Sequence, residues 1–333
     1  MYLWQGEDDS SYCENEDACC GYSAVYDAKR VAEVLDIPHY VINFKEEFKK
    51  YVVDYFTEEY LNGRTPNPCI ACNRYLKWEA LLQRSLDLGA EYIATGHYAR
   101  ITSLPSGRLA VCRSVYENKD QSYALYGLTQ DQLTHTLFPV GQYDKDSVRR
   151  IAAEAGLPTA QKSESQDICF VPDGDCAGFI ERYTGRTAEP GNFVTSDGTV
   201  LGHHKGITHY TIGQRRGLNL AMGERVFVTS INAAKNEVVI GSNKDLLSYR
   251  LKADKLNFMS LTEQEVNEKI KQGGPADLKA KIRYNMKPVP CRIESCSNDT
   301  AVIIFNEPVR AVTPGQAVVV YEGNTIVMGG TII

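Results

Sequence analysis

The sequence lacks the marks of a membrane or secreted protein. No apolar run approaches the roughly 20 residues that a membrane-spanning helix needs. Residues 1–9 contain neither the basic nor the apolar region of a signal peptide, and no internal repeat or low-complexity linker is found. These absences favour a cytoplasmic protein without a membrane partner.

An excess of positive charge is also missing. With 36 Lys and Arg against 42 Asp and Glu, the formal net charge is −6. This total does not point to a nucleic-acid-binding protein. It does not exclude one either, because phosphate contacts need only a local basic face.

The length and composition of the chain indicate a globular protein of several domains. A chain of 333 residues is too long for one ordinary core and suggests two or three domains. Its 43% hydrophobic and 23% charged residues are typical of soluble globular proteins. Ten cysteines spread over this length do not make a small disulfide scaffold, so we expect most of them to be reduced, buried or chemically employed.

Two of these cysteines, Cys69 and Cys72, lie three positions apart on a proline-stiffened loop. Pro66 and Pro68 fix their own φ and bias the residues before them toward extended backbone. An apolar pattern with helical spacing starts at Arg74, which puts Cys72 near a helix N-terminus, where the partial positive charge favours the thiolate. By itself the pair could be half of a zinc site, a redox pair, an iron–sulfur ligand pair or an accident.

The first half of the chain alternates helix and strand patterns. They predict a helix at 23–35, a buried strand at 40–44, a strand at 90–95 and a helix at 145–155 capped by Asp144. Such alternation indicates an α/β domain with a Rossmann-like parallel sheet, whose ligand site lies beyond the carboxyl ends of the strands. Gly96 and His97 stand at one of these ends.

The second half is rich in β patterns. Short strands are predicted at 226–231 and 237–240, a helix within 254–274, and successive strands over 278–333 divided at 298–299 and 322–324. A small β-barrel is the simplest interpretation of the C-terminus. We therefore divide the chain into a catalytic domain at 1–163, a central β-rich domain at 164–245 and a C-terminal β-barrel at 246–333.

Six blocks of sequence can be compared with known families. They read RTPNPCIACNR (64–74), ATGHY (94–98), KDQSY (119–123), LFPVG (137–141), ESQDICF (164–170) and YTIGQRRG (210–217). In this order they resemble the bacterial tRNA-specific 2-thiouridylases. The resemblance implies a first domain of the adenine nucleotide alpha hydrolase type with a PP-loop ATPase fold. It also implies an enzyme that uses ATP and Mg²⁺ to adenylate the C2 oxygen of the wobble uridine of tRNA and then replaces this oxygen by sulfur.

The resemblance further implies roles for three thiols. Cys72 resembles the attacking cysteine of the family, and Cys169 resembles its persulfide-bearing partner, with which it then closes a disulfide. Some members carry an aspartate in place of Cys69, so the three thiolates together could instead hold an iron–sulfur cluster with one open iron site. Both schemes stay open. Its apolar neighbours alone would make Cys169 a buried small hydrophobe.

Further contacts follow from the same resemblance. Gly96 resembles a nucleotide-contacting glycine, at which a missing side chain lets the backbone approach the adenylate, although it could be a simple turn glycine. The partners implied are a tRNA with a modifiable wobble uridine and a persulfide-donating sulfur carrier or cysteine desulfurase. The residues implied in contacts with the target base or the tRNA are Asn67, Pro68, Cys69, His97, Lys119, Asp120, Gln121, Arg283, Tyr284 and Gln316.

One element of the family pattern is not found. The family's Ser-Gly-Gly-x-Asp-Ser type loop around the ATP pyrophosphate does not occur, and the glycines of 213–217 are poorly spaced to replace it. We therefore expect a truncated parallel sheet, and an inactive remnant that binds tRNA without catalysis is the competing interpretation. A third interpretation makes Cys69 and Cys72 half of a structural zinc site. The cysteine-rich opening at Cys13, Cys19 and Cys20 could be a minor metal site or a surface loop.

The missing loop generates a prediction about nucleotide binding. We expect residues 1–333 to bind ATP weakly or not at all, and to be poorly soluble, because a parallel sheet without its first strand exposes unpaired backbone groups. Isothermal titration calorimetry of the purified chain with ATP measures this. Binding with a micromolar dissociation constant would contradict the expectation.

Overall fold

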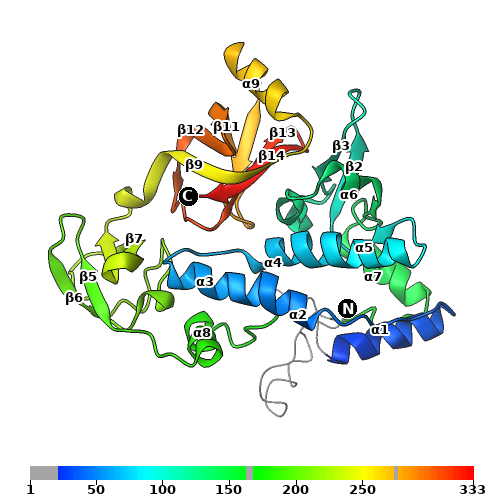
Figure 1. Ribbon diagram of the computed structural model, residues 1–333, viewed down its shortest axis with the longest axis horizontal. Helices are drawn as coiled ribbons and strands as arrows, with labels where there is room; N and C mark the ends of the chain where they lie inside the picture. The colour runs from blue at the N-terminus through cyan, green and yellow to red at the C-terminus, as the bar shows by residue number, and fades with distance from the viewer. Residues whose placement is uncertain (1–21, 163–167, 274–276) are drawn as a thin grey trace.

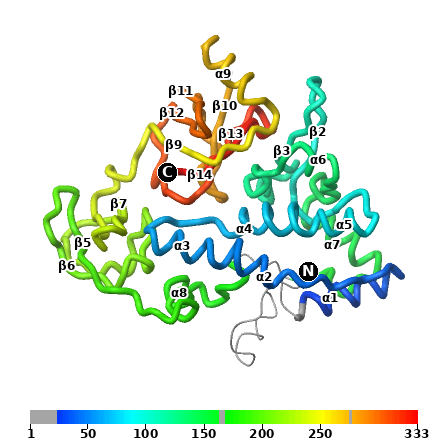
Figure 2. Tube along the Cα trace, in the orientation of Figure 1, coloured from blue at the N-terminus to red at the C-terminus, as the bar shows by residue number. Residues whose placement is uncertain are grey.

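The structure is a computed structural model, and it describes residues 22–162, 168–273 and 277–333. The suggested metal site at Cys13, Cys19 and Cys20 lies outside them. Figures 1 and 2 show a helical N-terminal part in blue and cyan, a β-rich central part in green, and a barrel in orange and red.

Two long helices dominate the N-terminal part, which also contains α1 (Tyr22–Val34), as predicted. The first long helix is formed by α2 (Lys45–Phe48), the π-helical η1 (Lys49–Asp54) and α3 (Tyr55–Leu61), with helical backbone across both joints. The second, which we call the cysteine helix, is formed by α4 (Pro68–Ala71), the π-helical η2 (Cys72–Leu81) and α5 (Leu82–Asp87). Their apolar sides pack together in one cluster with side chains of α8 (Cys176–Thr184).

A short parallel sheet confirms the α/β character of this part. β1 (Ile93–Ala94) pairs with β4 (Thr136–Leu137), and the two strands run in the same direction. β1 lies inside the strand predicted at 90–95 and ends two residues before Gly96. The helix predicted at 145–155 is α7 (Lys145–Glu154), and the Asp144 carboxylate caps it by accepting a hydrogen bond from the Ser147 N–H.

The buried strand predicted at 40–44 is wrong. This segment has only a single bridge, at Asn43, and the side chains of Tyr40 and Val41 are 76% and 54% exposed. A parallel strand is stable when neighbouring strands and covering helices bury it on both faces. The apolar run 40–44 has the composition of such a strand, but its first two side chains face solvent.

The central part is a small mixed sheet. Its order is β6-β5-β8-β7, and β5 runs parallel to β8. The strands predicted at 226–231 and 237–240 are confirmed, and Asn236 turns the chain between them with φ 51°. The elements are β5 (Gly191–Val194), β6 (Val200–His204), η5 (Ile207–His209), β7 (Phe227–Asn232), η6 (Ala233–Lys235) and β8 (Glu237–Gly241).

The C-terminal part is a closed six-stranded barrel, as predicted. The strand order is β13-β10-β11-β12-β9-β14, and pairing of β13 with β14 closes it. The predicted division at 298–299 is a turn in which both residues have positive φ. The elements are η7 (Lys244–Leu246), β9 (Leu247–Phe258), α9 (Glu263–Lys271), β10 (Leu278–Lys281), β11 (Val289–Ser297), β12 (Thr300–Arg310), β13 (Ala317–Glu322) and β14 (Thr325–Ile332).

A hairpin joins the first part to the barrel. β2 (Ala99–Ser103) pairs with β3 (Leu109–Arg113), and Cys112 of β3 pairs with Thr325 of β14. After the hairpin the chain forms η3 (Glu117–Lys119), η4 (Ser122–Leu125) and α6 (Gln130–Thr134). Within the described part of the chain, no helix is long and apolar enough to cross a membrane.

The barrel also contacts the loop that leads into the cysteine helix. The Thr65 N–H donates to the Pro314 carbonyl at 2.9 Å, and the Gln316 Nε2 donates to the Thr65 carbonyl at 2.8 Å. We call residues 313–316 the barrel loop. Gly315 has φ +91°, and a Cβ built on it would lie 3.0 Å from the backbone of Thr65. The close approach therefore needs glycine.

Gly315→Ala should destabilise the protein and loosen this contact. We expect a loss of about 1–3 kcal/mol, because alanine is strained at this φ and its methyl group collides with Thr65. Chemical denaturation measures the loss. Gly323→Ala is the matched control, because Gly323 lies in the same barrel with φ +59° but has no atom within 4 Å of the added Cβ. Equal losses in the two variants would contradict a role for the Thr65 contact.

Candidate functional site

The cysteine helix begins at Pro68, earlier than the apolar pattern starting at Arg74 suggests. Asn67 is its N-cap, and its side-chain oxygen accepts hydrogen bonds from the N–H groups of Cys69 at 3.1 Å and Ile70 at 3.3 Å. Proline at the first helical position is favourable, because that position needs no N–H donor. Cys69 therefore lies in the first turn, and Cys72 lies one turn further on.

Cys72 and Cys169 contact the same apolar cluster, although they are far apart in the sequence. We call it the Phe56 cluster. Its buried members include Phe48, Phe56, Leu76, Phe170 and Phe179, and both cysteines are partly buried against it. Phe170, which follows Cys169, meets Phe56 edge to face with ring centroids 5.2 Å apart.

Cys69 differs from these two thiols because its side chain is exposed and is not part of the Phe56 cluster. Within residues 22–162, 168–273 and 277–333, no three His, Cys, Asp or Glu side chains lie close enough together to hold a metal ion. Cys69, Cys72 and Cys169 all belong to these ranges. The structure therefore does not gather the three thiols into a cluster-binding set.

Three other cysteines are buried away from this region, which agrees with the expectation from their number. They are Cys112 in β3 and Cys291 and Cys296 in β11. Burial raises the pKa of Cys291 to about 12 and that of Cys296 to about 11. These two barrel thiols stay protonated and act as small apolar side chains.

Gly96 and His97 follow β1 after one intervening residue, Thr95. Among the residues that the structure describes, no atom lies within 4 Å of a Cβ built on Gly96, so there is open space beside this backbone. The His97 imidazole packs against Trp78 and Phe138, and its Nδ1 lies 2.8 Å from the Thr95 hydroxyl. Burial, with a smaller contribution from Lys77, lowers the pKa of His97 to about 3. The ring is therefore neutral at physiological pH.

The Lys119–Gln121 turn lies beside the barrel. The Asp120 carboxylate is buried, and it accepts hydrogen bonds from the N–H groups of Ser114 and Ser122 and from Arg113. The Lys281 ammonium lies 3.9 Å away. Gln121 accepts a hydrogen bond from the Tyr98 N–H. These partners give Asp120 an internal structural role, whereas the side chain of Lys119 is partly exposed.

The barrel side of this interface carries the remaining predicted tRNA contacts. Tyr284 is exposed, and its ring lies 6.4 Å from that of Tyr123, which follows the 119–121 turn. Arg283 donates to the Arg310 carbonyl, and burial together with Arg310 lowers the pKa of Arg283. Gln316 contacts Thr65 as described above. The structure thus brings the 119–121 turn, residues 283–284, Gln316 and the 67–69 segment to one interface.

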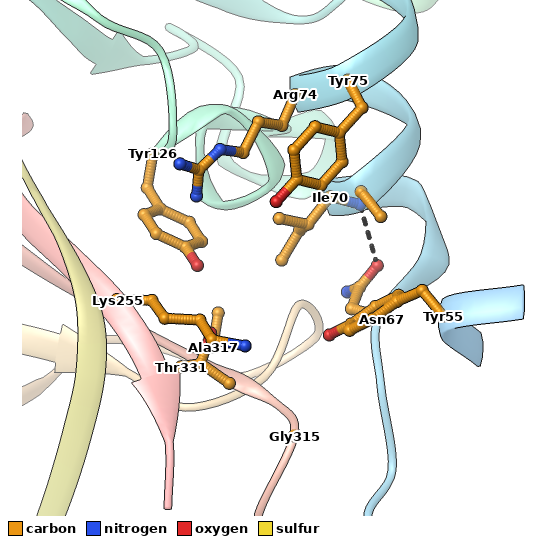
Figure 3. Close-up of a pocket in the computed structure, with 11 residues that line it drawn as sticks. Tyr55, Asn67, Ile70, Arg74, Tyr75, Tyr126, Lys255, Gly315, Ala317 and Thr331 are labelled. Carbon is orange, nitrogen blue, oxygen red and sulfur yellow. Dashed lines mark hydrogen bonds between the residues drawn. The ribbon is translucent and has the colours of Figure 1, made fainter. Parts of the chain in front are cut away.

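A pocket lies at the same interface and was not predicted from the sequence. The cysteine helix forms one wall and the barrel forms the opposite wall (Figure 3). The helical spacing of the residues on the first wall is a signal that could have indicated this face, whereas Lys255 carries no such signal. The pocket is lined by Tyr55, Asn67, Ile70, Ala71, Arg74, Tyr75, Tyr126, Lys255, Gly315, Ala317 and Thr331.

Comparison with protein families identifies the class. A family model described as tRNA methyl transferase HUP domain matches residues 1–173, one described as tRNA methyl transferase PRC-barrel domain matches 177–242, and one described as aminomethyltransferase beta-barrel domain matches 248–333. With the α/β part, the central sheet and the closed barrel described above, these matches define a three-part tRNA-modifying protein.

Relatives of known name identify the family within this class. The tRNA-specific 2-thiouridylase MnmA of Lachnoclostridium phytofermentans is 57% identical over 333 residues, which are 100% of this chain and 91% of the relative. The enzyme of the same name from Clostridium acetobutylicum is 50% identical over 98% of this chain and 89% of its own length, and that from Carboxydothermus hydrogenoformans is 51% identical over 94% and 84%. The chain belongs to the family of tRNA-specific 2-thiouridylases.

The lowered pKa of His97 predicts an acid-dependent loss of stability. An unfolded histidine has a pKa of about 6.5, so stability is complete above that pH and falls as pH decreases toward about 3. At pH 5 the free energy of unfolding should be lower by about 2 kcal/mol than at neutral pH. His97→Gln should flatten this dependence in denaturation experiments between pH 5 and 8. The exposed His203→Gln is the control, and a similar flattening there would rule out His97 as the cause.

Proposed function

We propose that this chain replaces the C2 oxygen of the wobble uridine of tRNA by sulfur, in a reaction that uses ATP. The observation that carries the proposal is the common position of Cys72 and Cys169 on the Phe56 cluster. The family-model descriptions mention methyl transfer, but two thiols on one cluster and the names of the relatives both favour sulfur transfer.

The chemistry has two stages. Transfer of AMP from ATP to the C2 oxygen makes this oxygen a good leaving group. Cys169 then carries a persulfide, and the Cys72 thiolate attacks the sulfur bonded to the Cys169 Cβ. Hydrosulfide leaves, attacks C2 and displaces AMP, while Cys72 and Cys169 remain joined by a disulfide. An external thiol must supply two electrons to reduce this disulfide before the next turnover.

The structure favours the persulfide scheme over an iron–sulfur cluster. A cluster needs all three thiolates as ligands, whereas Cys69 is exposed and does not share the Phe56 cluster. No step is therefore assigned to a cluster. In the family's Asn-Pro segment, Cys69 would instead contact the target base together with Asn67 and Pro68.

Open space beside the Gly96 backbone fits an adenosine group that approaches closely. Mg²⁺ would be held mainly through ATP phosphates, because the described residues include no carboxylate cluster of the kind that binds it directly. Around this centre, the tRNA interface would be formed by His97, Lys119, Gln121, Arg283, Tyr284 and Gln316. Asp120, whose carboxylate is enclosed, would hold the 119–121 turn in place.

The proposal also includes a sulfur donor, a cellular compartment and three functional units. A sulfur carrier or cysteine desulfurase would deliver the persulfide, and the reaction would take place in the cytoplasm. The functional units would be residues 1–163, 164–245 and 246–333. The relatives named 2-thiouridylases match 94–100% of this chain. This match favours an active enzyme over an inactive tRNA-binding remnant, and it favours the use of ATP over the weak ATP binding expected from the missing loop.

Cysteine variants test the proposal. Full-length protein is incubated with ATP, a persulfide donor and unmodified tRNA, and 2-thiouridine is measured by mass spectrometry of digested nucleosides. Cys72→Ser and Cys169→Ser should each reduce product roughly 10²-fold or more, because each removes a group that forms or breaks a covalent bond. Cys69→Ala should keep most activity under the persulfide scheme, whereas the cluster scheme requires it to be as inactive as the other two.

Cys112→Ser is the matched control. Cys112 lies 3.2 Å from the Thr325 hydroxyl, and serine can keep this hydrogen bond. Its activity should therefore stay near that of the unmodified protein. Full activity of Cys169→Ser, or no 2-thiouridine from the wild-type chain, would disprove the proposed function.

A further inference from the structure

The pocket between the cysteine helix and the barrel is a site separate from the two thiols. Asn67, Ile70, Ala71, Arg74 and Tyr75 recur at helical spacing, so they share one face of the helix, and that face lines the pocket. Cys72 is not among the lining residues and contacts the Phe56 cluster instead. The same helix therefore presents a thiol on one side and a polar pocket on another.

Two positive charges meet in this pocket. Arg74 comes from the helix and Lys255 from β9, and neither forms an ion pair with any carboxylate in the ranges that the structure describes. The Arg74 guanidinium lies 5.4 Å from the centre of the Tyr75 ring. Figure 3 shows both cationic groups at the edge of the same open space. Cations that converge on a space without a carboxylate partner are suited to an anionic ligand.

An irregularity in the barrel positions Lys255. Gly329 and Thr331 of β14 pair with Asn257 and Asp254 of β9, so β9 has one extra residue over this stretch. Lys255 lies in this bulge with φ 51°, a left-handed conformation that is uncommon for a residue with a side chain. Bulges of this kind change the direction of a side chain and are frequent next to active sites.

Neutral donors complete the lining. The hydroxyls of Tyr55, Tyr75 and Tyr126 point toward the space in Figure 3. Burial raises the pKa of Tyr55 and of Tyr126, and Asp254 contributes to the rise at Tyr126, so both hydroxyls keep their protons. Asn67 adds an amide. A guanidinium, an ammonium and phenol hydroxyls are the donors that proteins commonly direct at phosphate oxygens.

The size of the pocket and the residues around it limit the kinds of ligand that can bind there. The cavity has a volume of about 60 Å³, which is room for a few waters or one small tetrahedral anion. Asn67 belongs both to the pocket and to the segment assigned to the target base, while Gly315 and Ala317 flank Gln316. A backbone phosphate close to a base bound at Asn67 would therefore lie within reach.

We propose that this pocket binds a phosphate group while the target uridine is at the thiols. We infer that the bound group is a backbone phosphate of tRNA beside the target nucleotide. This identity of the ligand rests on the proposed function. A free phosphate has the same chemistry, so the experiment must separate the two sources. The planar Arg74 guanidinium would donate two hydrogen bonds to the phosphate, and the Lys255 ammonium would contact the phosphate from the barrel side.

The test uses the full-length chain and an RNA hairpin that contains a tRNA anticodon loop with a wobble uridine. Binding is followed by fluorescence anisotropy over a range of salt concentrations. Arg74→Gln and Lys255→Gln should each weaken binding several-fold at low salt and reduce the slope of log K against log salt by about 0.7–0.9, the value of one phosphate contact. Arg74→Lys should restore the slope but only part of the affinity.

Lys252→Gln is the matched control, because Lys252 is exposed on the same strand and does not line the pocket. It should change neither slope nor affinity. Circular dichroism checks folding, and Lys255 is exposed, so its replacement does not disturb a core. A second arm titrates the same proteins with inorganic phosphate by calorimetry. Weaker phosphate binding with unchanged RNA binding would support the site and assign it to a free phosphate.

Two outcomes would overturn the inference. One is an unchanged RNA slope together with unchanged phosphate binding in both Arg74→Gln and Lys255→Gln, and the other is no binding of either ligand by the wild-type chain. RNA binding needs neither ATP nor sulfur. A wild-type chain that binds the hairpin through Arg74 but makes no 2-thiouridine would therefore refute the proposed function and leave the phosphate site intact.

Discussion

The contact between the barrel loop and Thr65 is the constraint on which the site depends. The segment between α3 and α4 has no regular structure of its own, yet both backbone groups of Thr65 bond to the barrel, through Pro314 and Gln316. Asn67 follows two residues later and caps the cysteine helix. The barrel therefore sets where this helix starts, and so where Cys72 and the pocket lie. Gln316, which the family resemblance makes a tRNA contact, also has this structural role.

Positive side chains gather at one interface, although the net charge of the chain is negative. The chain is acidic overall, with a net charge of −6, but Arg74, Lys255 and Arg283 gather at the interface between the first part and the barrel. Arg310 of β12 lies nearby, where it contacts Asn243 and Gly213 of the central part. Burial lowers the pKa of Arg283, and the nearby Arg310 cation lowers it further. An arrangement of this kind costs free energy in the unbound protein, and a polyanion relieves it. This distribution explains how an acidic protein can bind tRNA.

The elements that were predicted correctly are those with strong local signals. The helix at α7 has its Asp144 cap, and the turn at Asn298 and Asp299 has residues that accept positive φ. The segment 40–44 failed because apolar composition does not say whether a neighbouring strand is present. The cysteine helix starts at Pro68, before the apolar pattern does, because proline is favourable in a first helical turn but adds no helical periodicity to the sequence.

For the site, local patterns along the chain specify the residue types and their order: a proline-rich segment, two thiols one turn apart, and Gly96 at the end of a strand. Those features depend on sequence neighbours, where propensity and spacing act. The packing of distant segments places Cys72 and Cys169 on the Phe56 cluster, encloses the Asp120 carboxylate, and brings Lys255 opposite Arg74. Each of these depends on contacts between segments far apart in sequence, and burial and strand register, which no local pattern encodes, determine them.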